Sequence, residues 1–134
     1  MRIAIIVLVC LCVLPYIMAC ISGYYRRKQL GVIDNEKPRE QYAHLTGPGA
    51  RAVAAQQNAW EALIIYSAAL LAVVATRVDV PNLALAAIIV LVARILHGFF
   101  YLANFDKLRT LAFLVAIVAC FYLFFIALAN LFMR

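Results

Sequence analysis

Four long apolar blocks constrain this 134-residue chain more than any other feature of its sequence. They run over residues 3–25, 52–76, 80–103 and 108–132. Each block can cross a bilayer as a helix, because a hydrocarbon core about 30 Å thick needs about 20 apolar residues that rise about 1.5 Å each. Hydrophobic residues make up 68% of the chain and charged residues 13%, whereas soluble domains average about 45–50% and about 25%. The sequence therefore predicts a multi-pass membrane protein in contact with lipid.

The connections between the blocks indicate how the helices pack. Residues 26–49 form a polar loop, and the other two connections are only a few residues long. Short connections make consecutive helices lie antiparallel and adjacent. We therefore predict an all-α fold, a four-helix up-down bundle that forms one domain over residues 1–134. The first block exceeds the h-region of a signal peptide and basic residues follow it at once, so we interpret it as a retained helix.

Basic residues are distributed unevenly between the two ends of this bundle. Eight Lys and Arg residues flank the end with the long loop and three flank the other end. The eight are Arg26, Arg27, Lys28, Lys37, Arg39, Arg51, Lys107 and Arg109, and the three are Arg2, Arg77 and Arg134. The positive-inside rule then predicts a cytoplasmic loop 26–49 and both termini outside. Most of the net charge of +6 lies at the end with the long loop, where it attracts the anionic headgroups of lipids. The positive charge therefore requires no nucleic-acid partner, and we expect none.

The four cysteines all fall within the predicted spans, at positions 10, 12, 20 and 120. Their spacing matches neither a Cys-x-x-Cys motif nor a Cys/His ligand set, so we expect no disulfide framework and no metal site. Thiols in apolar surroundings are usually inert packing residues.

Two charged residues lie deep within the predicted spans, Glu61 and Arg94. An ionised side chain at the bilayer centre costs at least about 2.5–3.5 kcal/mol, so such residues rarely face lipid. At helical spacing Glu61 shares one side of its helix with Arg51 and Asn58. The third block carries a similar polar stripe, formed by Arg94, His97, Tyr101 and Asn104. We expect the two stripes to face each other, another subunit or a water-filled cleft.

Glu61 and Arg94 also lie at matching depth. Glu61 comes ten residues after Arg51, and Arg94 comes ten residues before Asn104, so both should lie about 15 Å below the same surface. This predicts either a buried ion pair or two poles of one polar pocket. Interhelical hydrogen bonds that merely hold helices together are a structural alternative, since they average about 0.6 kcal/mol in membranes. The convergence of two charges and several amides favours a site.

Several of these residues together resemble the MAPEG family, the membrane-associated proteins in eicosanoid and glutathione metabolism. Arg51-x6-Asn58-x2-Glu61 resembles the signature of the family's second helix, and "ISGYYRRK" at 21–28 resembles the end of its first helix. "RILHGFFY" at 94–101 has the Arg-x2-His-x3-Tyr spacing of the prostaglandin synthase branch, and Arg109-Thr110 matches the start of the fourth helix. The resemblance covers essentially the whole chain and is to a bacterial-type member.

The resemblance implies a homotrimer in the cell inner membrane that binds glutathione between neighbouring subunits, near the cytoplasmic face. It implies a glutathione-dependent transferase or peroxidase that acts on lipophilic electrophiles arriving from the bilayer. Arg109 would be the catalytic residue that favours the thiolate of glutathione. The remaining site residues carried over from the family and the two stripes are Arg26, Arg51, Asn58, Glu61, Arg94, His97, Tyr101 and Thr110.

Three positions depart from the family pattern. Ala54 stands where the family usually has an arginine, Ile65 where a proline is common, and Phe113 where a tyrosine is expected. Loss of the arginine removes a clamp for a glutathione carboxylate. Two alternatives therefore stay open: a scaffold that binds lipid or a thiol without turnover, and a small four-helix transporter that uses Glu61.

Overall fold

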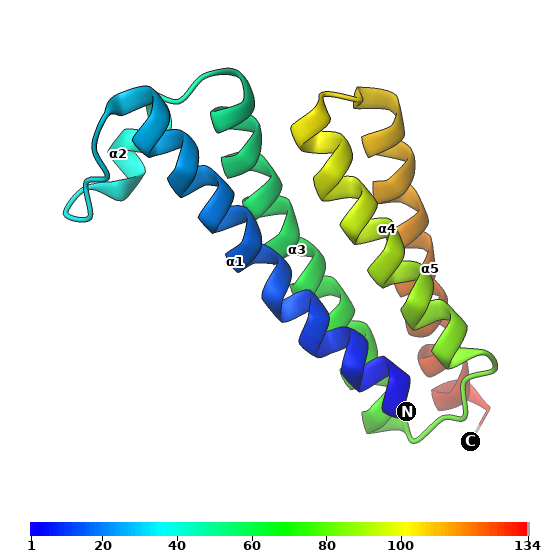
Figure 1. The fold of residues 1–134 in the computed structure, drawn as a ribbon. Coiled ribbons are helices and arrows are strands. Elements are labelled where there is room, and N and C mark those ends of the chain that lie inside the picture. The colour runs from blue at the N-terminus through cyan, green and yellow to red at the C-terminus, as the bar shows by residue number, and fades with distance from the viewer. Residues whose placement is uncertain (134) are drawn as a thin grey trace.

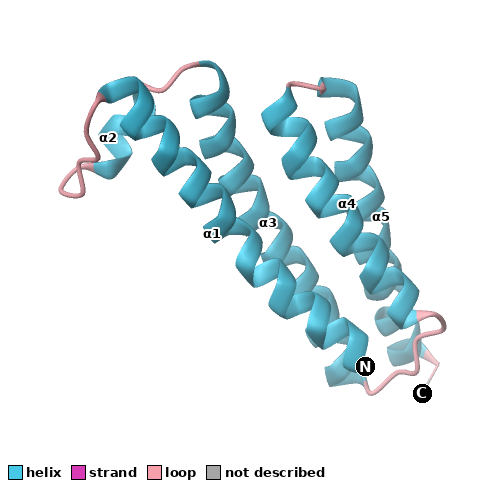
Figure 2. Ribbon diagram, viewed as in Figure 1, coloured by secondary structure: helices cyan, strands magenta, loops and turns pink. Residues whose placement is uncertain are grey.

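The computed structural model of the protein describes residues 1–133 and is built from α-helices (Figure 1). Within that range the chain contains no strand (Figure 2). Four helices are long and apolar enough to cross a membrane, and a short fifth helix lies between the first two of them. The elements are α1 (Arg2–Leu30), α2 (Pro38–Ala43), α3 (Gly47–Thr76), α4 (Leu83–Ala103) and α5 (Asp106–Phe132). The predicted all-α membrane bundle is confirmed.

The ends of the helices differ from the predicted bounds for local reasons. Helix α1 continues past residue 25 to Leu30 and ends at Gly31, whose φ of 78° places it in the left-handed region that glycine tolerates. Helix α3 begins at Gly47 rather than residue 52, with a proline in its first turn. The connection predicted over residues 26–49 is therefore shorter and contains α2. Helix α4 starts later than residue 80, at Leu83.

The four long helices form two antiparallel hairpins, α1 with α3 and α4 with α5 (Figure 1). Both termini lie at one end of the bundle, here called the termini end, and the α4–α5 turn and the connection holding α2 lie at the other, here called the loop end (Figure 1). Arg134, which the sequence placed on the outer side, falls outside the described residues.

The apolar core occupies the half of the bundle nearest the termini. Its largest fully buried side chains are Leu11 from α1, Tyr66 and Val73 from α3, Val90 from α4 and Leu123 from α5. The Tyr66 hydroxyl donates to the carbonyl oxygen of Ala4 over 2.9 Å and so joins α3 to α1. The buried side chains of ionisable residues, Arg26, Arg94 and His97, lie instead toward the loop end, whereas the buried polar side chain of Thr76 lies at the termini end. The fold thus separates an apolar half from a polar half.

Gly98 permits a close approach between α4 and α1. A Cβ atom at this position would lie 2.7 Å from the Cε atom of Met18. We expect Gly98→Leu to lower the free energy of unfolding by about 1–3 kcal/mol, because the larger side chain overpacks this contact. Detergent unfolding followed by circular dichroism measures the change. Gly23→Leu is the matched control, since a Cβ atom there meets nothing within 4 Å, and an equal loss in both variants would contradict the prediction.

Candidate functional site

Arg94 is the centre of the polar half of the bundle. Its side chain is 5% exposed, and its Nη2 atom donates to the backbone carbonyl of Asn58 over 2.7 Å, from α4 to α3. Among residues 1–133, its Nε atom is the one buried side-chain nitrogen or oxygen without a hydrogen-bond partner. A guanidinium held deep between membrane helices thus retains an unused donor.

A series of rings leads from Arg94 toward the loop end. The Arg94 guanidinium lies 6.0 Å from the ring centroid of Phe113, and the His97 ring lies 6.3 Å from the same ring. His97 packs edge-on against Tyr101 at 5.5 Å, and the Arg109 guanidinium lies 4.5 Å above the Tyr101 ring. Rings attract cations placed over their faces within about 6 Å. The predicted residues of α4 therefore form one continuous series with Arg109 of α5.

Glu61 does not pair directly with Arg94. The only ion pair among the described residues joins Lys37 to Glu40 over 3.4 Å. Both residues belong to the connection between α1 and α3. The prediction of a direct ion pair between Glu61 and Arg94, one of the two arrangements considered, is therefore wrong. Glu61 and Arg94 instead line one cavity of about 90 Å³ with Asn58, which agrees with the alternative of a shared polar pocket.

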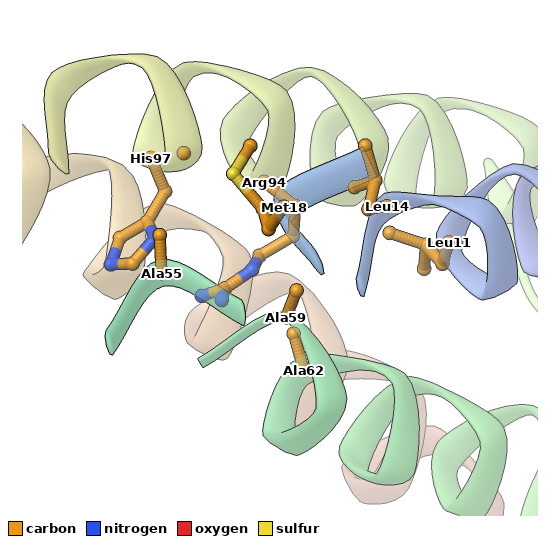
Figure 3. Close-up of a pocket in the computed structure, with 9 residues that line it drawn as sticks. Leu11, Leu14, Met18, Ala55, Ala59, Ala62, Arg94 and His97 are labelled. Atoms are coloured by element: carbon orange, nitrogen blue, oxygen red, sulfur yellow. The ribbon is translucent and has the colours of Figure 1, made fainter. Parts of the chain in front are cut away.

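The cavities beside Arg94 are small. A second one, of about 10 Å³, lies between α1, α3 and α4, and Figure 3 shows Arg94 and His97 on its α4 side, facing Ala55 and Ala59. Sites for drug-sized ligands occupy about 300–1,000 Å³. Neither cavity can hold a tripeptide such as glutathione. Larger hollows of about 680 and 390 Å³ lie between α4 and α5, and almost all of the residues that line them are apolar.

Arg26 is engaged by the connection between α1 and α3. Its Nε atom donates to the side-chain oxygen of Gln41 over 2.8 Å, and its Nη2 atom donates to the backbone carbonyl of Asp34. The guanidinium also lies 5.4 Å from the Tyr42 ring centroid. Gln41 in turn accepts from the backbone N–H of Asp34 over 2.9 Å. Arg26 thus holds α2 against the end of α1.

We expect Arg26→Ala to loosen the connection between α1 and α3. The substitution removes two hydrogen bonds from a cation, each worth about 1.5–3 kcal/mol. Hydrogen–deuterium exchange of residues 32–45 should become faster, while exchange in α4 and α5 stays unchanged. Arg27→Ala is the control, because Arg27 is the exposed neighbour. Unchanged exchange in Arg26→Ala would show that other contacts hold α2.

Two further predicted residues also bind backbone carbonyls. The Nε atom of Arg51 donates to the carbonyl of Leu102 over 3.3 Å, which connects α3 to the end of α4. Thr110 is exposed, and its hydroxyl donates to the carbonyl of Asp106 within its own helix over 3.0 Å. The structure therefore brings Asn58, Glu61 and Arg94 together around the cavity. It brings His97, Tyr101 and Arg109 together in the series of rings. Arg26, Arg51 and Thr110 form hydrogen bonds elsewhere.

Sequence reasoning missed three residues that shape the site. Phe113 contacts both Arg94 and His97. In the sequence it was noted only because the family has a tyrosine at this position. Its position one helical turn after Arg109 could have placed it on the same face. Cys120 lines the cavity, and Gln41 binds Arg26. Nothing in the polar loop distinguishes Gln41 from its neighbours. Within the described residues, no three His, Cys, Asp or Glu side chains gather as metal ligands.

The four spans and the polar half of the bundle define a multi-pass membrane protein with an internal cationic site. The chain belongs to the MAPEG family, whose profile matches residues 3–129. Membership fits a membrane-located function related to glutathione. Comparison with curated proteins found no match, and comparison with solved structures also found none.

Proposed function

We propose that this protein is a glutathione-dependent transferase or peroxidase for lipophilic electrophiles, with its site completed between the protomers of a homotrimer. The observation that carries the proposal is the position of Glu61, which is exposed in the middle of α3 and pairs with no cation among residues 1–133. A carboxylate at that depth costs at least about 2.5–3.5 kcal/mol when it faces lipid. Another protomer that covers this face of α3 removes the cost.

The surface around Glu61 supports an interface there. Gln57, Trp60 and Ile64 are exposed on the same helix, with Trp60 38% and Ile64 66% exposed. The two cavities beside Arg94, one of which Glu61 lines, are too small for a tripeptide. A glutathione site that uses Glu61 therefore needs walls from a second copy of the chain. Family membership supports the proposed trimer, since MAPEG proteins are generally trimeric.

The chemistry of glutathione suits Glu61 and the arginine side chains of the polar half of the bundle. The tripeptide carries two carboxylates and an amine, which match arginine guanidinium groups and the Glu61 carboxylate respectively. Its thiol reacts as the thiolate, and a nearby guanidinium favours that charged form. Arg109 is the candidate for this role, because it lies in the first turn of α5 with its guanidinium over Tyr101 and is only partly buried. Electrophiles would enter from the bilayer.

One observation favours a second function, a MAPEG scaffold that binds lipid or a thiol without turnover. The Asn58 side chain donates to the carbonyl of Ala54 over 3.1 Å, at the position that lacks the family's arginine. Arg26 is likewise committed to the connection that holds α2. Two groups expected to bind glutathione are thus occupied by the protein itself.

Calorimetric titration of the purified protein with glutathione tests the main proposal. We expect binding at millimolar ligand or tighter, weakened about tenfold or more in Glu61→Gln, because one charge-assisted hydrogen bond is worth about 1.5–3 kcal/mol. Gln57→Ala is the control on the same exposed face of α3. Native mass spectrometry of the same sample should give the trimer. No binding at millimolar glutathione would contradict the main proposal and favour the scaffold function. Substrate uptake into liposomes, if Glu61→Gln abolished it, would identify a transporter instead.

We further propose the cell inner membrane as the location, with the loop end cytoplasmic and both termini outside. The positive charge at the loop end supports this orientation. In intact spheroplasts a membrane-impermeant maleimide should label Asp79→Cys and leave Glu36→Cys unlabelled, since these exposed residues lie in opposite connections. Inverted vesicles should give the reverse pattern. Labelling of Glu36→Cys in intact spheroplasts would contradict the orientation.

A further inference from the structure

The Arg94 guanidinium lacks the partners that a buried cation requires. It donates once to the Asn58 carbonyl, contacts the Phe113 ring and, among residues 1–133, forms no ion pair. Its Nε atom has no acceptor among those residues. A buried donor without an acceptor costs about 1–3 kcal/mol, and more when the group is charged. The guanidinium therefore has hydrogen-bonding capacity that residues 1–133 leave unused.

The cavity beside Arg94 has the size and the polar groups for that purpose. It measures about 90 Å³ and lies between α3, α4 and α5. Since liquid water occupies about 30 Å³ per molecule, about three molecules fit. The wall carries the Glu61 carboxylate, the Asn58 amide and the Cys120 thiol as well as Arg94, and the remaining wall is apolar. Each water molecule can therefore find the two or more polar partners that hold it in place.

We propose that this cavity is a water-binding site, in which ordered water molecules accept from the Arg94 guanidinium and donate to the carboxylate of Glu61. The two opposite charges are then coupled through water rather than by direct contact. This arrangement gives the guanidinium further acceptors and links the two side chains across the cavity. It does not depend on glutathione, because it uses only groups of one protomer.

Water fits this cavity better than the other ligands that its chemistry admits. The Glu61 carboxylate on the wall opposes a second anion such as chloride. A lipid headgroup or acyl chain exceeds the cavity volume of about 90 Å³, given that pockets for larger ligands start at about 300 Å³. An empty cavity would be expected only where the lining is wholly apolar.

Radiolytic labelling in water enriched in oxygen-18 tests the proposal. X-ray pulses convert bound water into hydroxyl radicals, which oxidise the side chains that touch it. For the full chain in nanodiscs without glutathione, we expect label on Cys120 and Phe113, which line the cavity. Tyr66 and Leu123 are the internal controls, because both are fully buried and do not line the cavity, so they should stay unlabelled. A wild-type protein without label on Cys120 and Phe113 would overturn the proposal.

A filled cavity provides the matched test. Ala116→Leu adds a side chain to the cavity wall, and Ala127→Leu adds the same atoms at an equally buried position of α5 outside the cavity. Labelling of Cys120 and Phe113 should fall several-fold in the first variant and stay unchanged in the second. Equal labelling in both would overturn the proposal. So would a several-fold rise in labelling when gluconate replaces chloride, because it would show that chloride occupied the site. Should Ala116→Leu fail to fold, the wild-type pattern and the chloride arm still decide.

Discussion

Replacing Tyr66 by alanine is expected to lower the free energy of unfolding by about 3–5 kcal/mol, the range found when a fully buried aromatic side chain is truncated. Tyr66 is 0% exposed and packs within the apolar core. Lipid is as apolar as the protein interior, so the loss comes from packing contacts and the cavity left behind rather than from exposure to water. Reversible unfolding in mixed detergent micelles, followed by circular dichroism, measures the change.

Two further variants separate the causes of this loss. Tyr66→Phe removes only the hydrogen bond to the Ala4 carbonyl, and we expect it to cost about 0.6 kcal/mol, the average for such bonds in a membrane protein. Tyr122→Ala is the matched control, because that hydroxyl also donates to a backbone carbonyl, that of Pro81, but the side chain is 36% exposed. A loss in Tyr122→Ala as large as that in Tyr66→Ala would contradict the packing explanation.

Arg109→Ala should have the largest effect on function. Under the proposed function, loss of the guanidinium removes a charge-assisted interaction worth about 1.5–3 kcal/mol, so glutathione conjugation should fall by about tenfold to a hundredfold. The fraction of bound glutathione present as thiolate should fall with it. Conjugation to chlorodinitrobenzene and the ultraviolet absorbance of the thiolate measure the two effects.

The remaining variants at α5 define what Arg109 does. Arg109→Lys keeps the charge but loses the planar group that lies over the Tyr101 ring, so we expect partial recovery of activity. Lys107→Ala removes an exposed cation from the same turn of α5 and should leave conjugation unchanged. Wild-type thiolate formation in Arg109→Ala would assign the role to another residue.

Local features of the sequence were sufficient to predict the helices and most of the family signature. Apolar blocks of sufficient length require helices in a bilayer, because every backbone polar group there must bond within the protein. The ends of the helices were predicted less accurately. Helix α1 continues to Leu30 because its last turns carry basic side chains that tolerate the interface, and it ends where Gly31 can adopt a positive φ.

The contact partners of the polar side chains could not be predicted from the sequence, because helical periodicity does not give the distances between helices. Matching depth suggested either an ion pair between Glu61 and Arg94 or one shared pocket. Helices α3 and α4 are oriented so that a cavity lies beside both residues and no direct ion pair forms. Arg26 was expected at a ligand site, yet Gln41 from the short α2 binds it. Rotation of each helix about its own axis and the path of a polar loop both follow from packing of the whole chain.

The sequence by itself determined that this protein has four segments able to cross a membrane, belongs to the MAPEG family and carries two opposite charges within those segments. Hydrophobic length and residue identity decide these properties. Only the tertiary structure decided that Arg94 keeps an unpaired donor beside a cavity of about 90 Å³, and that Glu61 lies exposed on α3. The physical reason is that burial and cavities depend on how side chains from several helices fill space together.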